Sequence, residues 1–311
     1  MQDIALVKTL SMAYLFGLVT MTLASLLFRA IRPRLASQQR ADAGFGVIFG
    51  TFCATWLLAF LIWLGVVREV IIMSTRMFHM LMHGGWGAVI TAAGGYVMAL
   101  SLLLATFLWL RGRTPRSQSE PLSVVSGLTV VANSGISTAG LVGCWRPAVW
   151  VNPQYWERLS EAERLLALAH ERTHLRRRDN LRKLLLQFAS ALYAVLPFSR
   201  RWASDYELDC ELAVDDRCRR ENDAQAYASL VGRSAQFALT NFAGAGVTSV
   251  RSGMSQADLR VRLGHLTAPC RPSSAWATPL VLAAVITALA PAAALLSHSV
   301  TRCLLACYLG Y

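Results

Sequence analysis

Residues 160–180, SEAERLLALAHERTHLRRRDN, combine a helix start with a chemically distinctive helix interior. Ser160 and Glu163 form an S-x-x-E capping box, in which each side chain pairs with the backbone amide of the other residue. The apolar run 165–169 follows directly and has the character of a buried helix. The pattern predicts a helix that begins near residue 160 and continues through the polar residues after 169.

The polar part of this predicted helix contains the pattern HExxH at residues 170–174. Because His170 and His174 are four residues apart, both imidazoles lie on one helix face, one turn apart. Two nitrogens at that spacing can share one Zn²⁺ at about 2.0–2.1 Å each. Glu171 lies about 100° around the helix axis from His170, where it can take a proton from metal-bound water, whose pKa zinc lowers to about 7. The pattern predicts one zinc ion per chain with Glu171 as catalytic base; the alternative is an amphipathic helix with two histidines at its polar boundary.

A hydrolytic zinc site usually has three protein ligands, so a third ligand is expected outside the HExxH helix. The segment 204–216, SDYELDCELAVDD, carries Glu207, Glu211 and Asp215 at intervals of four residues, which places them on one helix face. One of these carboxylates can bind the metal while the next supports a ligand histidine. The alternative is an acidic helix face in solvent. Acidic residues at this spacing repel one another, and in a basic chain their clustering favours a cation nearby.

The composition indicates a membrane protein. The chain has 311 residues, of which 55% are hydrophobic, and its mean hydropathy of +0.42 is high for a soluble domain. The net charge is +12, from 30 Lys and Arg against 18 Asp and Glu, and many of the arginines flank long apolar runs. Membrane topology and anionic lipid explain these arginines. Because no recognition module is visible, we expect no direct nucleic-acid binding. The seven cysteines include no CxxC pair, which argues against a zinc-ribbon or thioredoxin-type site.

Four apolar runs without Asp, Glu, Lys or Arg are long enough to cross the hydrocarbon core, which takes about 20 residues. They cover residues 9–28, 43–67, 84–110 and 272–301. A transporter or channel would need ionisable groups inside such spans, so the composition of the runs argues against that class. His79 and His83 form a second pair four residues apart, in a predicted loop, and we interpret them as interfacial residues.

The distribution of arginine predicts the orientation in the membrane. The loop after the first run contains four arginines, whereas the loop after the second run contains only Arg68 and Arg76. This asymmetry places the N-terminus outside and the first loop on the cytoplasmic side. The expected location is a bacterial inner (cytoplasmic) membrane. The expected organisation is an N-terminal membrane domain with three spans, a cytoplasmic metallopeptidase domain, and a last span with a short outer tail, in residues 1–111, 112–271 and 272–311.

The predicted cytoplasmic domain combines strands and helices. The expected fold class is therefore a mainly α integral membrane protein with four transmembrane helices and an α+β zincin-like domain. Val-rich runs at 128–132 and 147–151 predict two β-strands. We nominate 147–151 as an exposed edge for an extended peptide substrate; the alternative is an ordinary core strand.

The apolar run 184–198 is short for a membrane span and lies between His174 and Glu207. A single crossing would put these two residues on opposite sides of the membrane, where they could not share a metal. The run must therefore re-enter the membrane, lie at its surface or pack on the spans. Arginines at both ends favour a helix held at an anionic leaflet.

Several of these segments together resemble a known family. The run PAVWVNP at 147–153, the HExxH helix with Arg-Arg-Asp at 177–179, and YELDCELAV at 206–214 are similar to the membrane zinc peptidases of the BlaR/MecR type. These are β-lactam sensor-transducers and their relatives. The resemblance covers roughly residues 125–265, and a more distant one is to the HtpX/Ste24-type peptidases.

The resemblance assigns roles to particular residues. It implies that His170, His174 and Glu207 bind the zinc and that Glu171 is the base. Glu211 stands where the family usually has Asp, so a carboxylate is kept but is one methylene longer.

Further residues are candidates for supporting roles. Asp179 and Glu211 are candidates for orienting a ligand histidine. An oxyanion donor is also expected, for which Tyr206, His265 and a nearby arginine are candidates. The sequence does not choose among them.

The expected function is zinc-dependent endopeptidase activity at the cytoplasmic membrane surface, in signal transduction. The resemblance implies a cytoplasmic protein substrate, either a helix-turn-helix repressor or the protein's own chain. About ten residues follow residue 301, too few for the penicillin-binding domain of the β-lactam sensors, so we expect a shorter family member. Membrane lipid is the other expected partner, and the sequence allows a homodimer. The alternative is a non-catalytic membrane signalling protein that keeps the metallopeptidase fold and passes its signal by contact.

Overall fold

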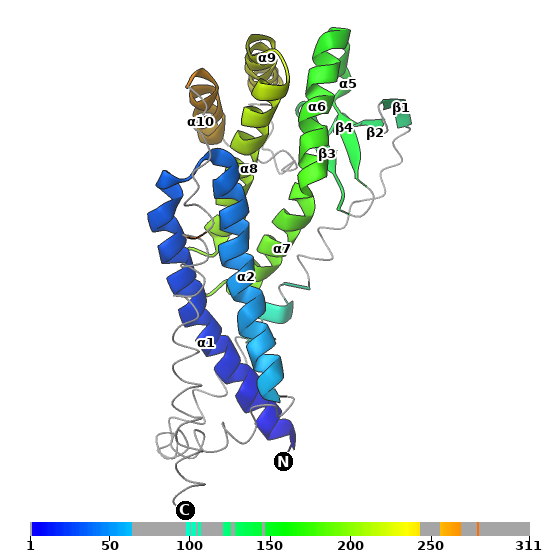
Figure 1. Ribbon diagram of the computed structural model, residues 1–311. Helices are drawn as coiled ribbons and strands as arrows, with labels where there is room; N and C mark the ends of the chain where they lie inside the picture. The colour runs from blue at the N-terminus through cyan, green and yellow to red at the C-terminus, as the bar shows by residue number, and fades with distance from the viewer. Residues whose placement is uncertain are drawn as a thin grey trace, which may run out of the picture.

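The computed structural model describes residues 2–63, 98–99, 101–103, 105–106, 121–125, 128–144, 147–242, 256–268 and 279. Two long antiparallel helices, α1 and α2, run along one side of the molecule (Figure 1). A small β-sheet and helices α6, α9 and α10 gather at the end of this hairpin that lies away from the N-terminus. Helices α7 and α8 connect the two parts.

The N-terminal hairpin consists of α1 (Gln2–Ile31), the short 3-10 helix η1 (Arg32–Arg34) and α2 (Ser37–Trp63). Near the turn that connects them, the two helices share a cluster of buried apolar side chains. Further along, Thr20 and Thr55 form a hydrogen bond of 3.1 Å between their hydroxyls. Apolar packing and buried hydroxyl pairing therefore both hold α1 against α2.

The predicted membrane spans are only partly within the described residues. The run 9–28 lies inside α1, and the run 43–67 begins inside α2 and extends past its last described residue. No helix in the part of the chain that the structure describes is both long and apolar enough for a membrane crossing. The runs 84–110 and 272–301 lie almost entirely outside the described residues, as do the predicted domain boundaries near 111 and 271.

The sheet has four strands in the order β1-β2-β4-β3. They are β1 (Pro121–Val125), β2 (Leu128–Ala132), β3 (Ala139–Val142) and β4 (Ala148–Val151). β1 pairs antiparallel with β2, β2 parallel with β4, and β3 antiparallel with β4. The two strands expected from the Val-rich runs are confirmed.

The nomination of 147–151 as an exposed edge is wrong. β4 lies between β2 and β3, so both of its sides are occupied by strand pairing. Within the described sheet β3 is at the edge instead. The sequence did not predict β3, because its residues, AGLV, include a glycine and lack the β-branched pattern of the neighbouring strands.

Helix α6 (Glu161–Arg177) follows the short helix α5 (Pro153–Glu157) and packs on the sheet. Its Leu168 is buried among the side chains of β2 and β4. The capping box at Ser160 and Glu163 is present, which confirms the predicted helix start. The helix ends at Arg177, and the next residue, Arg178, has a left-handed φ of 56°. Arg178 is the single residue between α6 and α7, and its backbone conformation changes the direction of the chain.

Helices α7 (Asp179–Leu192) and α8 (Arg200–Glu221) form a second hairpin. The run 184–198 makes up most of α7 and the turn that follows. Its buried residues join one apolar cluster with residues of α1 and α2. The rings of Tyr14 and Tyr193 are stacked with centroids 5.4 Å apart. The run packs on the first two helices, in agreement with one of the three predicted placements. Its position relative to a membrane stays a prediction.

The last described helices, α9 (Ala224–Phe242) and α10 (Gln256–Thr267), pack on the second half of α8. Val214 and Cys218 from α8, Tyr227 and Val231 from α9, and Leu266 from α10 form a buried cluster. Helix α6 contacts both α8 and α9. The HExxH helix is thus enclosed by the sheet on one side and by α8 and α9 on the other.

Candidate metal centre

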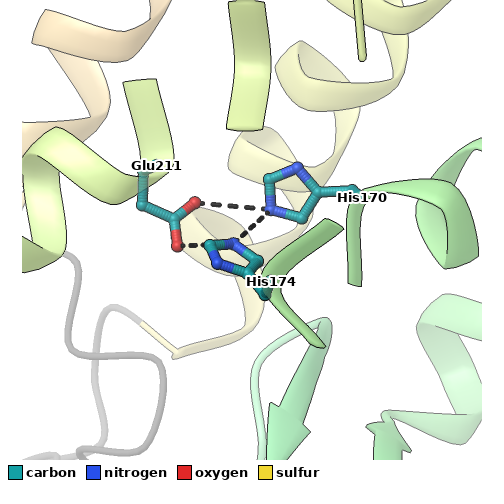
Figure 2. Close-up of side chains that lie close together, drawn as sticks. All are labelled: His170, His174 and Glu211. Carbon is teal, nitrogen blue, oxygen red and sulfur yellow. Dashed lines mark hydrogen bonds and ion pairs between the residues drawn. The ribbon is translucent and has the colours of Figure 1, made fainter. Parts of the chain in front are cut away.

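Two histidines of α6, His170 and His174, and one glutamate of α8, Glu211, converge at the centre of this arrangement (Figure 2). We call these three residues the His–Glu group. The Nε2 atoms of His170 and His174 are 3.1 Å apart. The Glu211 carboxylate places Oε2 at 3.4 Å from His170 Nε2 and Oε1 at 3.3 Å from His174 Nε2. One ligand atom from each residue lies within 4.8 Å of the others. Imidazole nitrogens and a carboxylate oxygen are the donors that zinc takes in hydrolytic sites, so the residues fit the metal.

His174 is oriented by Asp179, the first residue of α7. His174 Nδ1 lies 2.9 Å from Asp179 Oδ2, and the proton on Nδ1 leaves Nε2 with its lone pair. The Asp179 carboxylate also accepts from Tyr206 Oη at 3.1 Å and from Arg177 Nε at 3.2 Å. A carboxylate held by three partners keeps the imidazole in one tautomer and one orientation.

His170 is oriented through a longer chain of hydrogen bonds. Its Nδ1 lies 2.7 Å from the hydroxyl of Tyr227 on α9, and that hydroxyl donates to Asp215 Oδ1 at 2.6 Å. A tyrosine hydroxyl has one proton. Since that proton goes to Asp215, His170 Nδ1 carries the hydrogen and donates to the tyrosine oxygen. The lone pair of His170 is then on Nε2, on the same side as that of His174.

Arg262 of α10 completes the charge balance of the group. Its guanidinium lies 2.7 Å from Glu211 Oε2 and bonds Asp215 with two nitrogens, at 2.8 and 2.6 Å. Asp215 is 0% exposed and Arg262 is 6% exposed. Buried charges of this kind are tolerated because each carboxylate has a hydrogen-bonded counter-charge.

The electrostatics of the group favour positive charge between the two helices. Burial alone would lower the pKa of His174, but the carboxylates of Glu211 and Asp179 outweigh it and raise this pKa to about 9. Burial alone would raise the pKa of Glu211, but Arg262 and the two histidines bring it well below its usual value. An ionised carboxylate facing two imidazole nitrogens is an environment suited to a cation.

Glu171 follows His170 on α6 and is 7% exposed. Among the described residues its carboxylate takes part in no ion pair, in contrast to Glu211 and Asp215. It is not one of the three residues whose ligand atoms meet, as expected for a residue about 100° around the helix axis from His170. A buried carboxylate next to a zinc site is suited to proton transfer.

The third member of the group differs from the sequence-based expectation. Glu207, the expected ligand, lies one turn earlier on α8 and forms an ion pair with Lys183 of α7. Glu211, expected to support a histidine, lies against both imidazoles instead. The difference arises from how α7 and α8 pack: the Lys183 side chain binds the first carboxylate of the acidic face, and the second carboxylate is the one that reaches α6.

The two candidate oxyanion donors have other partners. Tyr206 donates to Asp179, and burial raises its pKa far above the usual value. His265 Nε2 lies 2.9 Å from Asp216 Oδ1, on a part of α8 that faces α10. Neither contact directs the side chain into the His–Glu group.

Sequence reasoning missed two residues that the structure adds to the site. Tyr227 lies 57 positions after His170, and Arg262 lies 47 positions after Asp215. Neither belongs to a motif. Their only sequence signals are a single tyrosine in the alanine-rich segment of α9 and one of the two arginines in a DLRVRL segment.

Taken together, an HExxH helix with both Nε2 atoms turned to one carboxylate from a second helix defines a zincin-type metallopeptidase site. Residues 90–235 match the family described as BlaR1 peptidase M56. The expected resemblance is therefore confirmed over this range. No curated protein and no solved structure matches the chain significantly. The matched range contains α6, α7 and α8 and ends within α9, before α10.

Proposed function

We propose that the protein is a zinc-dependent endopeptidase in which His170, His174 and Glu211 hold the metal and Glu171 acts as the general base. The observation that carries the proposal is the convergence of two imidazoles and one carboxylate, whose ligand atoms lie within 4.8 Å of one another. Glu171 lies on the same helix as the two histidines. Each histidine has its Nδ1 bonded on the far side, by Asp179 or Tyr227. The ligand atoms are thus held in place before a metal arrives.

A bound zinc ion would supply a Lewis acid for the scissile carbonyl and would lower the pKa of its water to about 7. The remaining chemistry belongs to the chain. Glu171 takes the proton as water attacks the carbonyl carbon, and it later delivers that proton to the leaving amine. The sheet and helices α8 and α9 around α6 limit the access of bulk water.

The edge strand β3 is the proposed binding surface for an extended peptide. It is the outermost strand of the described sheet on the side of β4 and contacts α6. Asn180 donates to the carbonyl oxygens of Leu141 at 2.9 Å and Gly143 at 3.1 Å, which ties the end of β3 to the start of α7. These two oxygens are already bonded, so the proposed pairing with a peptide uses the residues of β3 before Leu141. Asn180 directly follows Asp179, so the same turn fixes the strand and the imidazole of His174. Strand addition at such an edge supplies backbone hydrogen bonds to a peptide of any sequence.

We further propose that the enzyme works at the inner face of a bacterial cytoplasmic membrane, as part of a signalling pathway. The match of residues 90–235 to the M56 family and the apolar composition of the chain support this location. The arginine-rich connection between α1 and α2 lies on the site side of the hairpin, where Arg32 contacts α8. The proposed substrate is a cytoplasmic protein, either a helix-turn-helix repressor or the chain itself. Membrane lipid and a second copy of the chain are further proposed partners, and direct nucleic-acid binding is not expected.

The proposal is tested with detergent-purified full chain and a library of internally quenched fluorogenic peptides. Wild type and Glu171→Gln are compared for cleavage rate and for zinc content by elemental analysis. We expect about one zinc per chain in both proteins and a cleavage rate about 10²–10⁴-fold lower in the variant, because only the base is lost. Wild type without zinc after reconstitution, or equal cleavage by both proteins, would contradict the proposal. Self-cleavage of the chain is followed by mass spectrometry in the same samples, since the peptide library does not report on it.

A further inference from the structure

Arg262 is a buried arginine of α10 that contacts two carboxylates of α8 at the candidate metal centre, Glu211 and Asp215. It lies on α10, 6% exposed, and beyond the range that matches the M56 family. A buried arginine needs partners for its charge and its donors. The identity of those partners indicates what this residue does.

The guanidinium distributes its donors over two carboxylates of α8. One nitrogen is 2.7 Å from Glu211 Oε2. Two others bond Asp215 as a fork, at 2.8 and 2.6 Å. This geometry requires a planar group with several fixed donors, which arginine has and lysine lacks.

Each carboxylate leads to a different member of the His–Glu group. Glu211 belongs to the group directly, with one oxygen toward each histidine. Asp215 accepts from Tyr227, whose oxygen accepts from His170 Nδ1. One guanidinium thus restrains a carboxylate ligand from one side and an imidazole ligand from the other.

We propose that Arg262 is a positioning residue that sets the geometry of the metal centre through both of these connections. The inference rests on the proposed function, because it assigns a role toward the metal that the group would hold. Without Arg262, Glu211 and Asp215 would face each other four residues apart on α8 with no shared counter-charge. Glu211 would be free to rotate, and Tyr227 would lose the fixed acceptor that determines its hydrogen-bond direction.

The docking of α10 does not depend on Arg262 alone, so a variant at this position can be expected to fold. Arg219 of α8 donates to the carbonyl oxygens of His265 at 3.1 Å and Ala268 at 3.0 Å. His265 contacts Asp216, and Leu266 is part of the buried cluster with α8 and α9. These contacts hold the end of α10 in place when the guanidinium is removed.

The test measures metal binding rather than activity. Detergent-purified wild type, Arg262→Gln and Arg262→Lys are stripped of metal, and the apparent Kd for Zn²⁺ is determined by competition with a chromophoric chelator. The visible absorption spectrum of the Co²⁺-loaded proteins reports the ligand geometry. Arg32→Gln is the matched control, because Arg32 also pairs with a buried carboxylate of α8, Asp209, but on the opposite side of the helix.

We expect Zn²⁺ affinity to fall about 10–100-fold in Arg262→Gln, as for other outer partners of metal ligands, and the Co²⁺ spectrum to change. The Zn²⁺ affinity of Arg262→Lys should fall as well, since one ammonium group cannot replace the guanidinium that bonds Asp215 with two nitrogens. Arg32→Gln should keep the wild-type affinity and spectrum.

Three outcomes would overturn the inference. They are wild-type affinity in a folded Arg262 variant, an equal loss of affinity in Arg32→Gln, and an unchanged Co²⁺ spectrum in both Arg262 variants. If neither Arg262 variant folds, Tyr227→Phe tests the His170 connection by removing a single hydroxyl, and wild-type affinity there would overturn the inference too. Wild type that binds no Zn²⁺ would instead contradict the proposed function, so the two failures are distinguishable.

Discussion

Helix α8 carries acidic residues on two opposite faces, and the two faces have different partners. Glu211 and Asp215 face the histidines of α6 and Arg262 of α10. Asp209, about 200° around the axis from Glu211, is 1% exposed and paired with Arg32 of the N-terminal hairpin at 3.0 Å. Both faces pair buried carboxylates with an arginine, but only one of them includes imidazole nitrogens.

This difference separates two roles that look alike in the sequence. An acidic residue beside an arginine fixes the position of a helix. An acidic residue beside two imidazoles with bonded Nδ1 atoms is placed to share a cation with them. The face of α8 with Asp209 therefore fixes the helix against the N-terminal hairpin. The opposite face then holds Glu211 close to the two histidines. The following predictions compare the two faces by pairs of variants.

The largest expected effect comes from neutralising one acid on each face. Glu211→Gln should remove most Zn²⁺ affinity, a greater loss than the roughly 10–100-fold typical of outer partners, because a ligand oxygen is replaced. Asp209→Asn should keep the affinity and lower the free energy of unfolding by about 1–3 kcal/mol, because Arg32 loses its charged partner. Chelator competition and denaturant unfolding are measured on both variants. Equal loss of Zn²⁺ affinity in both would show that the two faces are not distinct.

A second pair compares Asp179, the first residue of α7, with Asp42 of α2. Asp179→Ala should weaken Zn²⁺ binding about 10–100-fold, since His174 Nδ1 loses its acceptor. The half-exposed Asp42 on α2 pairs with Arg182 and Arg177, and Asp42→Ala removes this partner. It should leave Zn²⁺ affinity unchanged and alter the free energy of unfolding by only about 0–1 kcal/mol. Unchanged affinity in Asp179→Ala would contradict the assigned role of this aspartate.

The smallest expected effect concerns the packing of the hairpin on α7. A Cβ added at Gly17 of α1 would overlap the hydroxyl oxygen of Tyr193, whereas one added at Gly46 of α2 would meet nothing within 4 Å. Gly17→Ala should therefore lower the free energy of unfolding by about 1–3 kcal/mol through overpacking. Gly46→Ala should raise it by about 0.5–1 kcal/mol, because alanine favours the helix. Equal unfolding curves for the two variants would show that the α1–α7 contact contributes little.

Local patterns predicted the parts of the site that lie within one helix. The capping box, the apolar run and the HExxH spacing all act within a few residues, and α6 has the expected start and ligand face. The run 184–198 was constrained by a topological argument, because residues on both sides of it have to meet. Its packing on α1 and α2 agrees with that argument.

Features that depend on contacts between elements could not be predicted in the same way. The periodicity of Glu207, Glu211 and Asp215 gives a shared helix face but not which turn meets α6; packing against Lys183 of α7 determines that. The order of the strands is also a long-range property. For this reason the sequence-based prediction placed β4 at the edge of the sheet, where the structure has β3. Tyr227 and Arg262 act across long stretches of chain, and one tyrosine or arginine carries no pattern that reveals such a contact.

The identity of the third ligand tests the account most directly. Zinc content of detergent-purified wild type, Glu211→Ala and Glu207→Ala is measured by elemental analysis after dialysis against a weak chelator. We predict about one zinc per chain in wild type and Glu207→Ala, and little or none in Glu211→Ala. Zinc retained in Glu211→Ala and lost in Glu207→Ala would contradict the geometry and return the ligand role to Glu207, as the sequence resemblance implied.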